Sequence, residues 1–197
     1  CDQVTSNIII HTFAYKIQDG SLSGELIKPI HPMLTNALVN NVAFKVLTIM
    51  GLIPVWIVLF MLFKPDFSGI TLTGVLLSLP VMIVAFFIGY LLSATIVSLA
   101  FWTTRIYSIH EFYFALILLF SGQFVPLPLM PKLIQDIAQY LPFQLLLYFP
   151  IQLILGKLST DQIILGYIMA GVWLVVATTL FNLVWRNGVK RFSAVGA

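Results

Sequence analysis

Few residues in this 197-residue sequence stand in a pattern that could support catalysis. His110 and Glu111 begin the stretch HEFYF, which lacks the second histidine of a zinc-binding HExxH motif. We therefore interpret them as a polar interfacial pair at the start of a helix. Ser121 and Gly122 have no GxSxG context and no convincing base partner. The sequence predicts no catalytic residue, no metal site and no cofactor site.

The sequence also lacks a motif for nucleotide hydrolysis and the cysteines for a disulfide or a multi-cysteine metal site. No GxxxxGK[ST] stretch is present, so the chain cannot hydrolyse a nucleotide through a phosphate-binding loop. Cys1 is the one cysteine, which excludes an internal disulfide and a multi-cysteine metal site. His11 and His31 stand alone and are interpreted as surface residues. We predict that the chain is not an enzyme.

The composition is that of an integral membrane protein. Hydrophobic residues make up 60% of the chain and charged residues only 9%, whereas soluble proteins carry roughly a quarter charged residues. Aromatic residues make up 14%, which suits interfacial anchoring in a bilayer. The net charge of +3 is small and scattered, so a nucleic-acid partner is not expected.

The apolar pattern predicts an all-α polytopic bundle with two regions. Residues 1–40 form a cytoplasmic or interfacial segment that is too polar to span, and residues 41–197 form a transmembrane domain. Ser159 or Thr160 is expected to cap the last membrane helix, with Asp161 near its positive end. The predicted parts of the domain are spans at residues 41–63, 71–102, 112–130 and 162–185, a re-entrant block at 131–156 and a cytoplasmic tail at 186–197.

Charged residues within the spans would indicate an ion pathway. None occurs in residues 46–63, 72–101 or 163–184. A carrier driven by protons or sodium, and a hydrolase embedded in the membrane, both need such buried groups. The spans therefore favour an apolar translocation path or a scaffold whose energy comes from elsewhere.

The stretch from Phe120 to Pro150 is as apolar as a span but is interrupted by five prolines. Proline removes a backbone donor and clashes with the preceding helical turn, so one straight helix cannot run through them. In hydrocarbon, irregular backbone is tolerated where protein or a water-filled cavity satisfies it. We therefore expect short re-entrant helices at one membrane face; an ordinary apolar loop packed on the bundle is the alternative. The prolines are Pro126, Pro128, Pro131, Pro142 and Pro150.

The basic residues predict the orientation. Seven of the ten fall on one side if the N-terminal segment, the loop at residues 103–111 and the tail share that side. The excess of lysine and arginine marks the cytoplasmic face, so both ends of this chain are expected in the cytoplasm and the proline-rich block at the outer face. The seven are Lys16, Lys28, Lys45, Arg105, Arg186, Lys190 and Arg191, and the other three are Lys64, Lys132 and Lys157.

Three stretches together resemble the permease subunit of a bacterial type-2 ABC transporter, in the family whose permease genes often come in pairs. Residues 17–32, IQDGSLSGELIKPIHP, resemble its cytoplasmic pattern G-x-L-x-x-x-L-x-x-P. FSGQFVPLPLMP, followed by LPFQLLLYFPIQLILG, resembles its outer block, and WRNGVKRFSAVGA resembles its C-terminal ending. The similarity extends from about Ile17 to the last residue.

The resemblance implies a role for two sets of residues. Such permeases usually have six spans, so two would precede this chain, which begins with Cys1 and is expected to be N-terminally truncated. The segment before the first visible span would contact the ATPase through a short helix that offers an apolar knob, Leu22 and Leu26; a surface helix resting on lipid headgroups is the alternative. The implied coupling residues are Gly20, Leu22, Glu25, Leu26, Lys28 and Pro29, and the implied outer re-entrant residues are Gly122, Pro126, Pro131, Pro142 and Pro150.

The resemblance also implies partners and a location. An ABC ATPase subunit would bind the ATP, a second permease would complete a homodimer or heterodimer, and membrane lipid would surround the spans. The family favours export and the plasma (inner) membrane of a bacterium. A membrane scaffold or assembly factor without transport is the alternative function. The sequence does not indicate the cargo.

Overall fold

The computed structural model describes residues 10–33, 39–63 and 69–195, and in these residues the chain is helical without a β-strand. The predicted all-α bundle is confirmed. Its elements, in chain order, are α2 (Ile10–Gln18), α3 (Ser23–Leu26), α4 (Val39–Phe63), α5 (Leu72–Ser98), η2 (Leu99–Phe101), α6 (Ile106–Phe120), η3 (Leu127–Leu129), α7 (Lys132–Ala138), α8 (Phe143–Leu146), α9 (Tyr148–Ile154) and α10 (Thr160–Val195).

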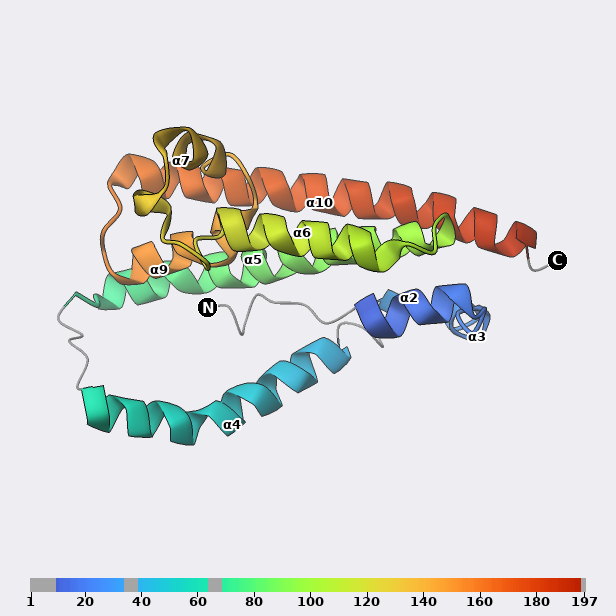
Figure 1. Cartoon of the computed structure of the whole chain (residues 1–197), viewed down its shortest axis with the longest axis horizontal. Coiled ribbons are helices and arrows are strands. Elements are labelled where there is room, and N and C mark those ends of the chain that lie inside the picture. The colour runs from blue at the N-terminus through green and yellow to red at the C-terminus, as the bar shows by residue number, and fades with distance from the viewer. Residues whose placement is uncertain (1–9, 34–38, 64–68, 196–197) are drawn as a thin grey trace.

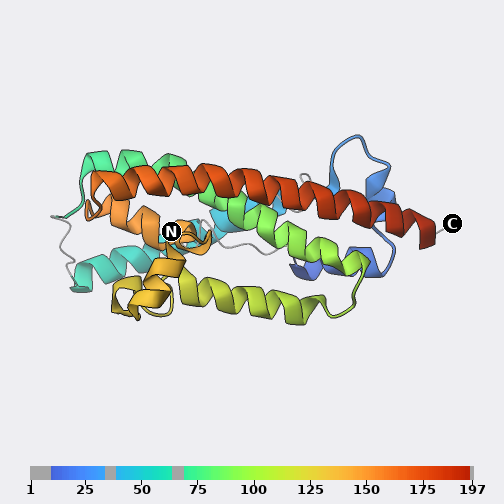
Figure 2. The same ribbon diagram turned by 90° about the horizontal axis from the view of Figure 1, so that it is seen from above.

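Helices α5 and α10 lie side by side along the length of the molecule, as Figures 1 and 2 both show. Small and β-branched residues at steps of about four line the buried face of α5, which lets neighbouring helices approach closely. The other elements pack around this pair: α6, α8 and α9 contact α5, and α2 contacts the end of α5 and η2. The buried residues on α5 include Gly74, Ser78, Ala85, Gly89, Ser93 and Val97.

Three of the described helices are long and apolar enough to cross a membrane: residues 42–63, 72–101 and 160–192. Their residue ranges overlap those of the first, second and fourth predicted spans. Helix α4 lies apart from the rest of the bundle in Figure 1, and its apolar window is unburied. Its first half approaches α5 across an apolar groove of about 420 Å³ that Lys45, Ile49 and Phe86 help to line.

The third predicted span differs from the structure at both ends. Its helix, α6, begins at Ile106 rather than near residue 112 and stops at Phe120, before the prolines. Fifteen residues rise about 22 Å, which is less than the roughly 30 Å of a bilayer core. The elements from η3 to α9 follow α6 in the chain.

The last helix also extends beyond its expected end. The sequence predicts that the span ends near residue 185, whereas α10 continues to Val195. Its start is as predicted: Ser159 and Gln162 form a reciprocal cap, in which the Ser159 amide donates to Gln162 Oε1 at 3.0 Å and the Gln162 amide donates to Ser159 Oγ at 3.4 Å.

One proline inside a long helix lies next to a hydrogen bond from a neighbouring helix. Pro80 lies inside α5 and opens the backbone hydrogen-bond ladder of the preceding turn. The hydroxyl of Tyr167, on α10, donates to the carbonyl oxygen of Leu77 in that turn at 2.5 Å. The carbonyl that loses its helical donor to Pro80 is that of Leu76, four residues earlier, so the Tyr167 bond fastens α10 to the adjacent carbonyl in the same turn.

Candidate functional site

The candidate coupling segment, residues 20–33, lies at one end of the bundle. In Figure 1, α2 and α3 lie near the C-terminal end of α10, whereas α7, α9 and the start of α10 occupy the opposite end. A buried cluster joins the segment to α5 and α10 at this end. Its members include Phe13, Ile17, Leu22, Met33, Tyr90, Val97, Ile106, Phe181 and Trp185.

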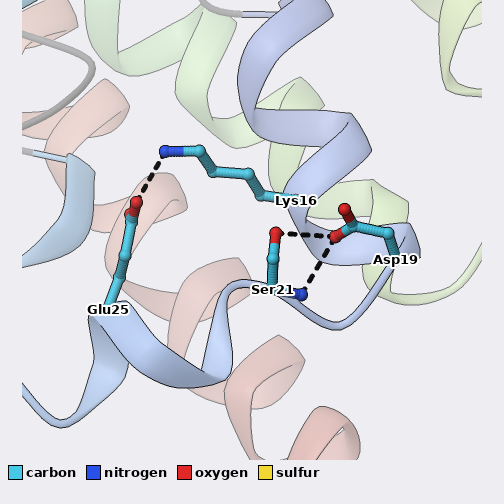
Figure 3. A network of polar contacts seen from close by, with 4 residues as sticks. All are labelled: Lys16, Asp19, Ser21 and Glu25. Carbon is cyan, nitrogen blue, oxygen red and sulfur yellow. Dashed lines mark hydrogen bonds and ion pairs between the residues drawn. The ribbon is translucent and has the colours of Figure 1, made fainter.

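A tight turn fixes the beginning of the segment, as Figure 3 shows. Asp19 Oδ1 accepts hydrogen bonds from the amide of Ser21 at 2.9 Å and from its hydroxyl at 2.7 Å. These bonds from Ser21 hold the pKa of the Asp19 carboxyl below its ordinary value. Gly20, between the two residues, has a φ of 82°, a left-handed conformation that glycine adopts without strain. Gly20 is therefore a turn residue.

An ion pair holds α3 against α2. Lys16 Nζ lies 2.6 Å from Glu25 Oε1, and the two side chains are 25% and 14% exposed (Figure 3). Because the pair is partly shielded from water, it is screened less than a surface pair. Glu25 is thus engaged within the chain, where it positions α3.

The expectation that Leu22 and Leu26 form an exposed apolar knob is not met. Leu22 has no exposed surface and belongs to the buried cluster, and Leu26 is half-buried against the same cluster. Their four-residue spacing does place them on one face, but that face packs on the chain's own helices α5 and α10. We therefore correct their predicted role: both leucines anchor the segment and do not present it to a partner.

The exposed part of the segment follows immediately. Ile27 is 86% exposed and Ile30 is 54% exposed, and Lys28 and Pro29 between them are exposed as well. We name Gly24, Ile27, Lys28, Pro29 and Ile30 the exposed tip. Sequence reasoning identified Lys28 and Pro29 but missed the two isoleucines. A signal was present for Ile27, which at helical spacing lies off the face shared by Leu22 and Leu26.

The end of the segment is anchored as firmly as its beginning. The hydroxyl of Tyr90, on α5, donates to the carbonyl oxygen of Met33, whose side chain is buried. The ring of His31 lies 4.8 Å from that of Trp185 and 5.7 Å from that of Phe181, measured between centroids. Burial of His31 lowers the pKa of its imidazole. The exposed tip is therefore a short loop held at both ends against α5 and α10.

The proline-rich block forms short helices at the opposite end of the bundle, and the prolines start them. Pro126 precedes η3, Pro131 precedes α7 and Pro142 precedes α8, while Pro150 is the third residue of α9. Proline is accepted in a first turn, because the amide it lacks would have no helical partner there. Gly122, with a φ of 79°, follows the end of α6.

Two kinds of contact fix this block to the spanning helices. The indole of Trp173, on α10, donates to the carbonyl oxygen of Tyr140 at 2.8 Å, and Phe143, Leu145, Phe149 and Leu153 are buried against the bundle. Within the block, the side-chain amide of Gln135 donates through Nε2 to the carbonyl oxygen of Met130 at 2.7 Å. The irregular backbone is thus satisfied partly by side chains of the protein itself, as membrane depth requires.

Reactive groups do not gather in the part of the chain that the structure describes. It contains no group of three or more histidine, cysteine, aspartate or glutamate residues that could hold a metal ion. His110 lies beside Tyr113, with ring centroids 6.4 Å apart. The features that remain are apolar spans, an anchored loop with an exposed tip at one end, and a packed block of short helices at the other.

A family comparison agrees with this arrangement. Residues 1–196 match the model of a family described as ABC-2 family transporter protein. Searches of curated proteins and of solved structures found no significant match. A match of nearly the whole chain, together with helices long and apolar enough to cross a membrane several times, leads to one conclusion: the protein is a multi-pass membrane protein of the ABC-2 transporter family, a permease-type membrane subunit.

Proposed function

We propose that this subunit forms the translocation path of an ATP-driven exporter and is coupled through its exposed tip to a separate ATPase subunit. Two neighbouring residues carry the proposal. Ile27 is 86% exposed, whereas Leu22, five residues earlier, is fully buried and anchors the segment to the bundle. Exposed apolar side chains that lie together on one surface often mark a place where another protein binds. Burial of an isoleucine contributes roughly 1.5–3 kcal/mol, so two such residues form a useful contact.

The anchored base makes the tip suitable for transmitting movement. Leu22 packs in the same cluster as Val97 of α5 and Trp185 of α10, and Met33 is hydrogen-bonded to Tyr90 of α5. A displacement of the tip by a closing ATPase would therefore be passed to the two central helices, because packed elements move together.

The lack of charged side chains in most of the long apolar helices supports an ATPase partner. Residues 46–63, 72–101 and 163–184 contain no charged side chain, so these spans offer no ligands for a coupling ion. In a transporter built this way, the driving energy comes from outside the membrane. ATP would be bound and hydrolysed on the partner chain, and export is the direction that the family resemblance implies.

The proposed arrangement places the exposed tip in the cytoplasm and the block at residues 122–156 on the outer face of a bacterial plasma membrane. Both ends of this chain would then be cytoplasmic, following the excess of basic residues near the tip. A second permease, identical or related, would face this one, and the outer blocks of the two would cap the path between them.

The ATPase contact can be tested with one apolar-to-acidic change. The tagged protein is purified in mild detergent from native membranes, and the proteins that accompany it are identified by mass spectrometry. Wild type is expected to retain a stoichiometric ATPase with a phosphate-binding loop, whereas Ile27→Asp should lose it, because a carboxylate would be desolvated in the contact. Ile27→Asp should still fold, because the side chain is exposed in the isolated chain.

Ile137→Asp is the matched control. Ile137 lies on α7 at the opposite end of the bundle and is 44% exposed, so the same change there should leave the ATPase bound. Equal retention of the ATPase by wild type and Ile27→Asp would exclude the tip as the contact. If wild type brought down membrane assembly proteins and no ATPase, a scaffold function would replace the transporter.

A further inference from the structure

An open cavity of about 620 Å³ lies between the end of the coupling segment and the last turns of α10. The segment and α10 supply its two walls, and no described catalytic or metal-binding group lies in it. Its lining residues are Leu26, Lys28, Pro29, Ile30, His31, Pro32, Trp185, Arg186, Val189 and Lys190.

The charge of this cavity has one sign. Lys28, Arg186 and Lys190 line it, and none of the described residues that line it is acidic. Glu25, next to Leu26 in the sequence, has one carboxylate oxygen paired with Lys16 at 2.6 Å. Three cations on two converging walls favour an anionic ligand, and an arginine fork suits the oxygens of a phosphate.

The position of the cavity along α10 indicates the depth of that ligand in the membrane. Residues 163–184 of α10 carry no charge, and Arg186 is the first basic residue after them. Trp185 lies between the two regions and is buried at the cavity, 4.8 Å from the ring of His31. A tryptophan followed by basic residues at the end of an apolar span marks the level of the lipid headgroups.

The surface next to the cavity is suited to acyl chains. Residues 172, 175, 179, 183, 186 and 190 recur at helical spacing and therefore share one face of α10. On this face Val175 is 65% exposed and Leu183 is 55% exposed, and Arg186 and Lys190 continue the same face at the cavity. An exposed apolar stripe that ends in two cations matches a phospholipid lying along the helix.

We propose that this cavity binds the phosphate headgroup of an anionic phospholipid, which bridges Lys28 of the coupling segment to Arg186 and Lys190 of α10. The bridge would stabilise the exposed tip in the position that the ATPase meets. Only the assignment of this lipid to the cytoplasmic leaflet depends on the proposed function, because binding itself needs neither ATPase nor transport.

The test uses the purified full chain without an ATPase, reconstituted in vesicles of phosphatidylcholine with or without phosphatidylglycerol. Lipid that remains bound after extraction in mild detergent is identified by native mass spectrometry. We expect phosphatidylglycerol to be retained over phosphatidylcholine by wild type. The double variant Arg186→Gln/Lys190→Gln should weaken this preference about thirtyfold, because each cation near an anionic surface contributes roughly a fivefold factor.

Arg191→Gln is the matched control, since Arg191 is the next residue of the same helix but lines a different cavity, with Asp19. It should retain the lipid as wild type does. Equal retention of both lipids by wild type, or undiminished retention by the double variant, would overturn the proposal. A third arm adds inorganic phosphate: if phosphate alone displaces the lipid at low concentration, the ligand is a free phosphate and the lipid assignment is wrong. If the double variant keeps the lipid here but no longer retains an ATPase when purified from native membranes, the cations contact the partner protein and the lipid assignment is wrong.

Discussion

Lys16 Nζ and Glu25 Oε1 lie 2.6 Å apart and connect α2 to α3 across the turn at Gly20. The pair fixes the short helix from which the exposed tip projects. Because Glu25 is 14% exposed and Lys16 is 25% exposed, loss of either charge leaves the other poorly solvated. The pair therefore positions the proposed ATPase contact without belonging to it.

Reversing one charge of the pair tests this role. Glu25→Lys should place two cations together and lower the free energy of unfolding by about 1–3 kcal/mol, as for a partly buried charge without a partner. The exchange Lys16→Glu/Glu25→Lys should recover part of that loss. Thermal unfolding in detergent measures each variant, and a double-mutant cycle gives the pairwise free energy. Additive effects of the two single changes would mean that the pair contributes nothing.

A close backbone approach joins the proline-rich block to the long helix α5. A Cβ atom on Gly74, in the first turn of α5, would lie 2.3 Å from the carbonyl oxygen of Leu153 in α9. We expect Gly74→Ala to separate the two helices and to cost about 1–3 kcal/mol, as overpacking usually does. Gly51→Ala in α4 is the control, because no atom lies within 4 Å of its Cβ position. Scanning calorimetry in detergent should show a lower Tm for Gly74→Ala alone.

The sequence was sufficient for features that local rules decide. The positions of Pro126, Pro131 and Pro142 before short helices follow from the missing amide of proline, and the Ser159 cap follows from a hydroxyl three residues before Gln162. These signals lie within one helical turn. The structure therefore agrees with what the sequence predicts for them.

The candidate site depends on contacts that no local pattern contains. Leu22 and Leu26 were predicted to share an apolar face, which they do, but the surface covering that face comes from Val97 and Trp185, far along the chain. A sequence pattern cannot tell whether such a face meets its own protein or a partner. For this reason the sequence pattern alone assigns the two leucines to the partner contact, whereas they pack on the chain's own helices.

His31 gives the coupling segment a dependence on pH. Burial lowers the pKa of its imidazole, because the charged form is less well solvated there. The unfolded chain then binds a proton more readily than the folded chain. Stability from neutral His31 is complete above the ordinary histidine pKa of about 6.5 and is lost as the pH falls toward the lower pKa of the folded state.

His31→Gln should remove this dependence, because glutamine has no proton to gain in this range. We expect the Tm of wild type in detergent to fall more steeply between about pH 6.5 and pH 5 than that of His31→Gln. His110→Gln is the control, since that histidine lies on α6 beside Tyr113 rather than in the cavity. Parallel pH profiles for wild type and His31→Gln would show that another group is responsible.

Opposite ends of the bundle should lie on opposite sides of the membrane, and cysteine labelling can establish which is which. Cys1 is the one cysteine of this sequence, so Cys1→Ser removes the thiol that these 197 residues contain. Single cysteines at Lys132, exposed on α7, and at Arg191, exposed on α10, then report the two ends. In intact cells a membrane-impermeant maleimide should label Lys132→Cys, while Arg191→Cys should react only after the membrane is opened. The reverse pattern would place the exposed tip outside, where no cytoplasmic ATPase can reach it, and would overturn the proposed coupling role together with the orientation predicted from the basic residues.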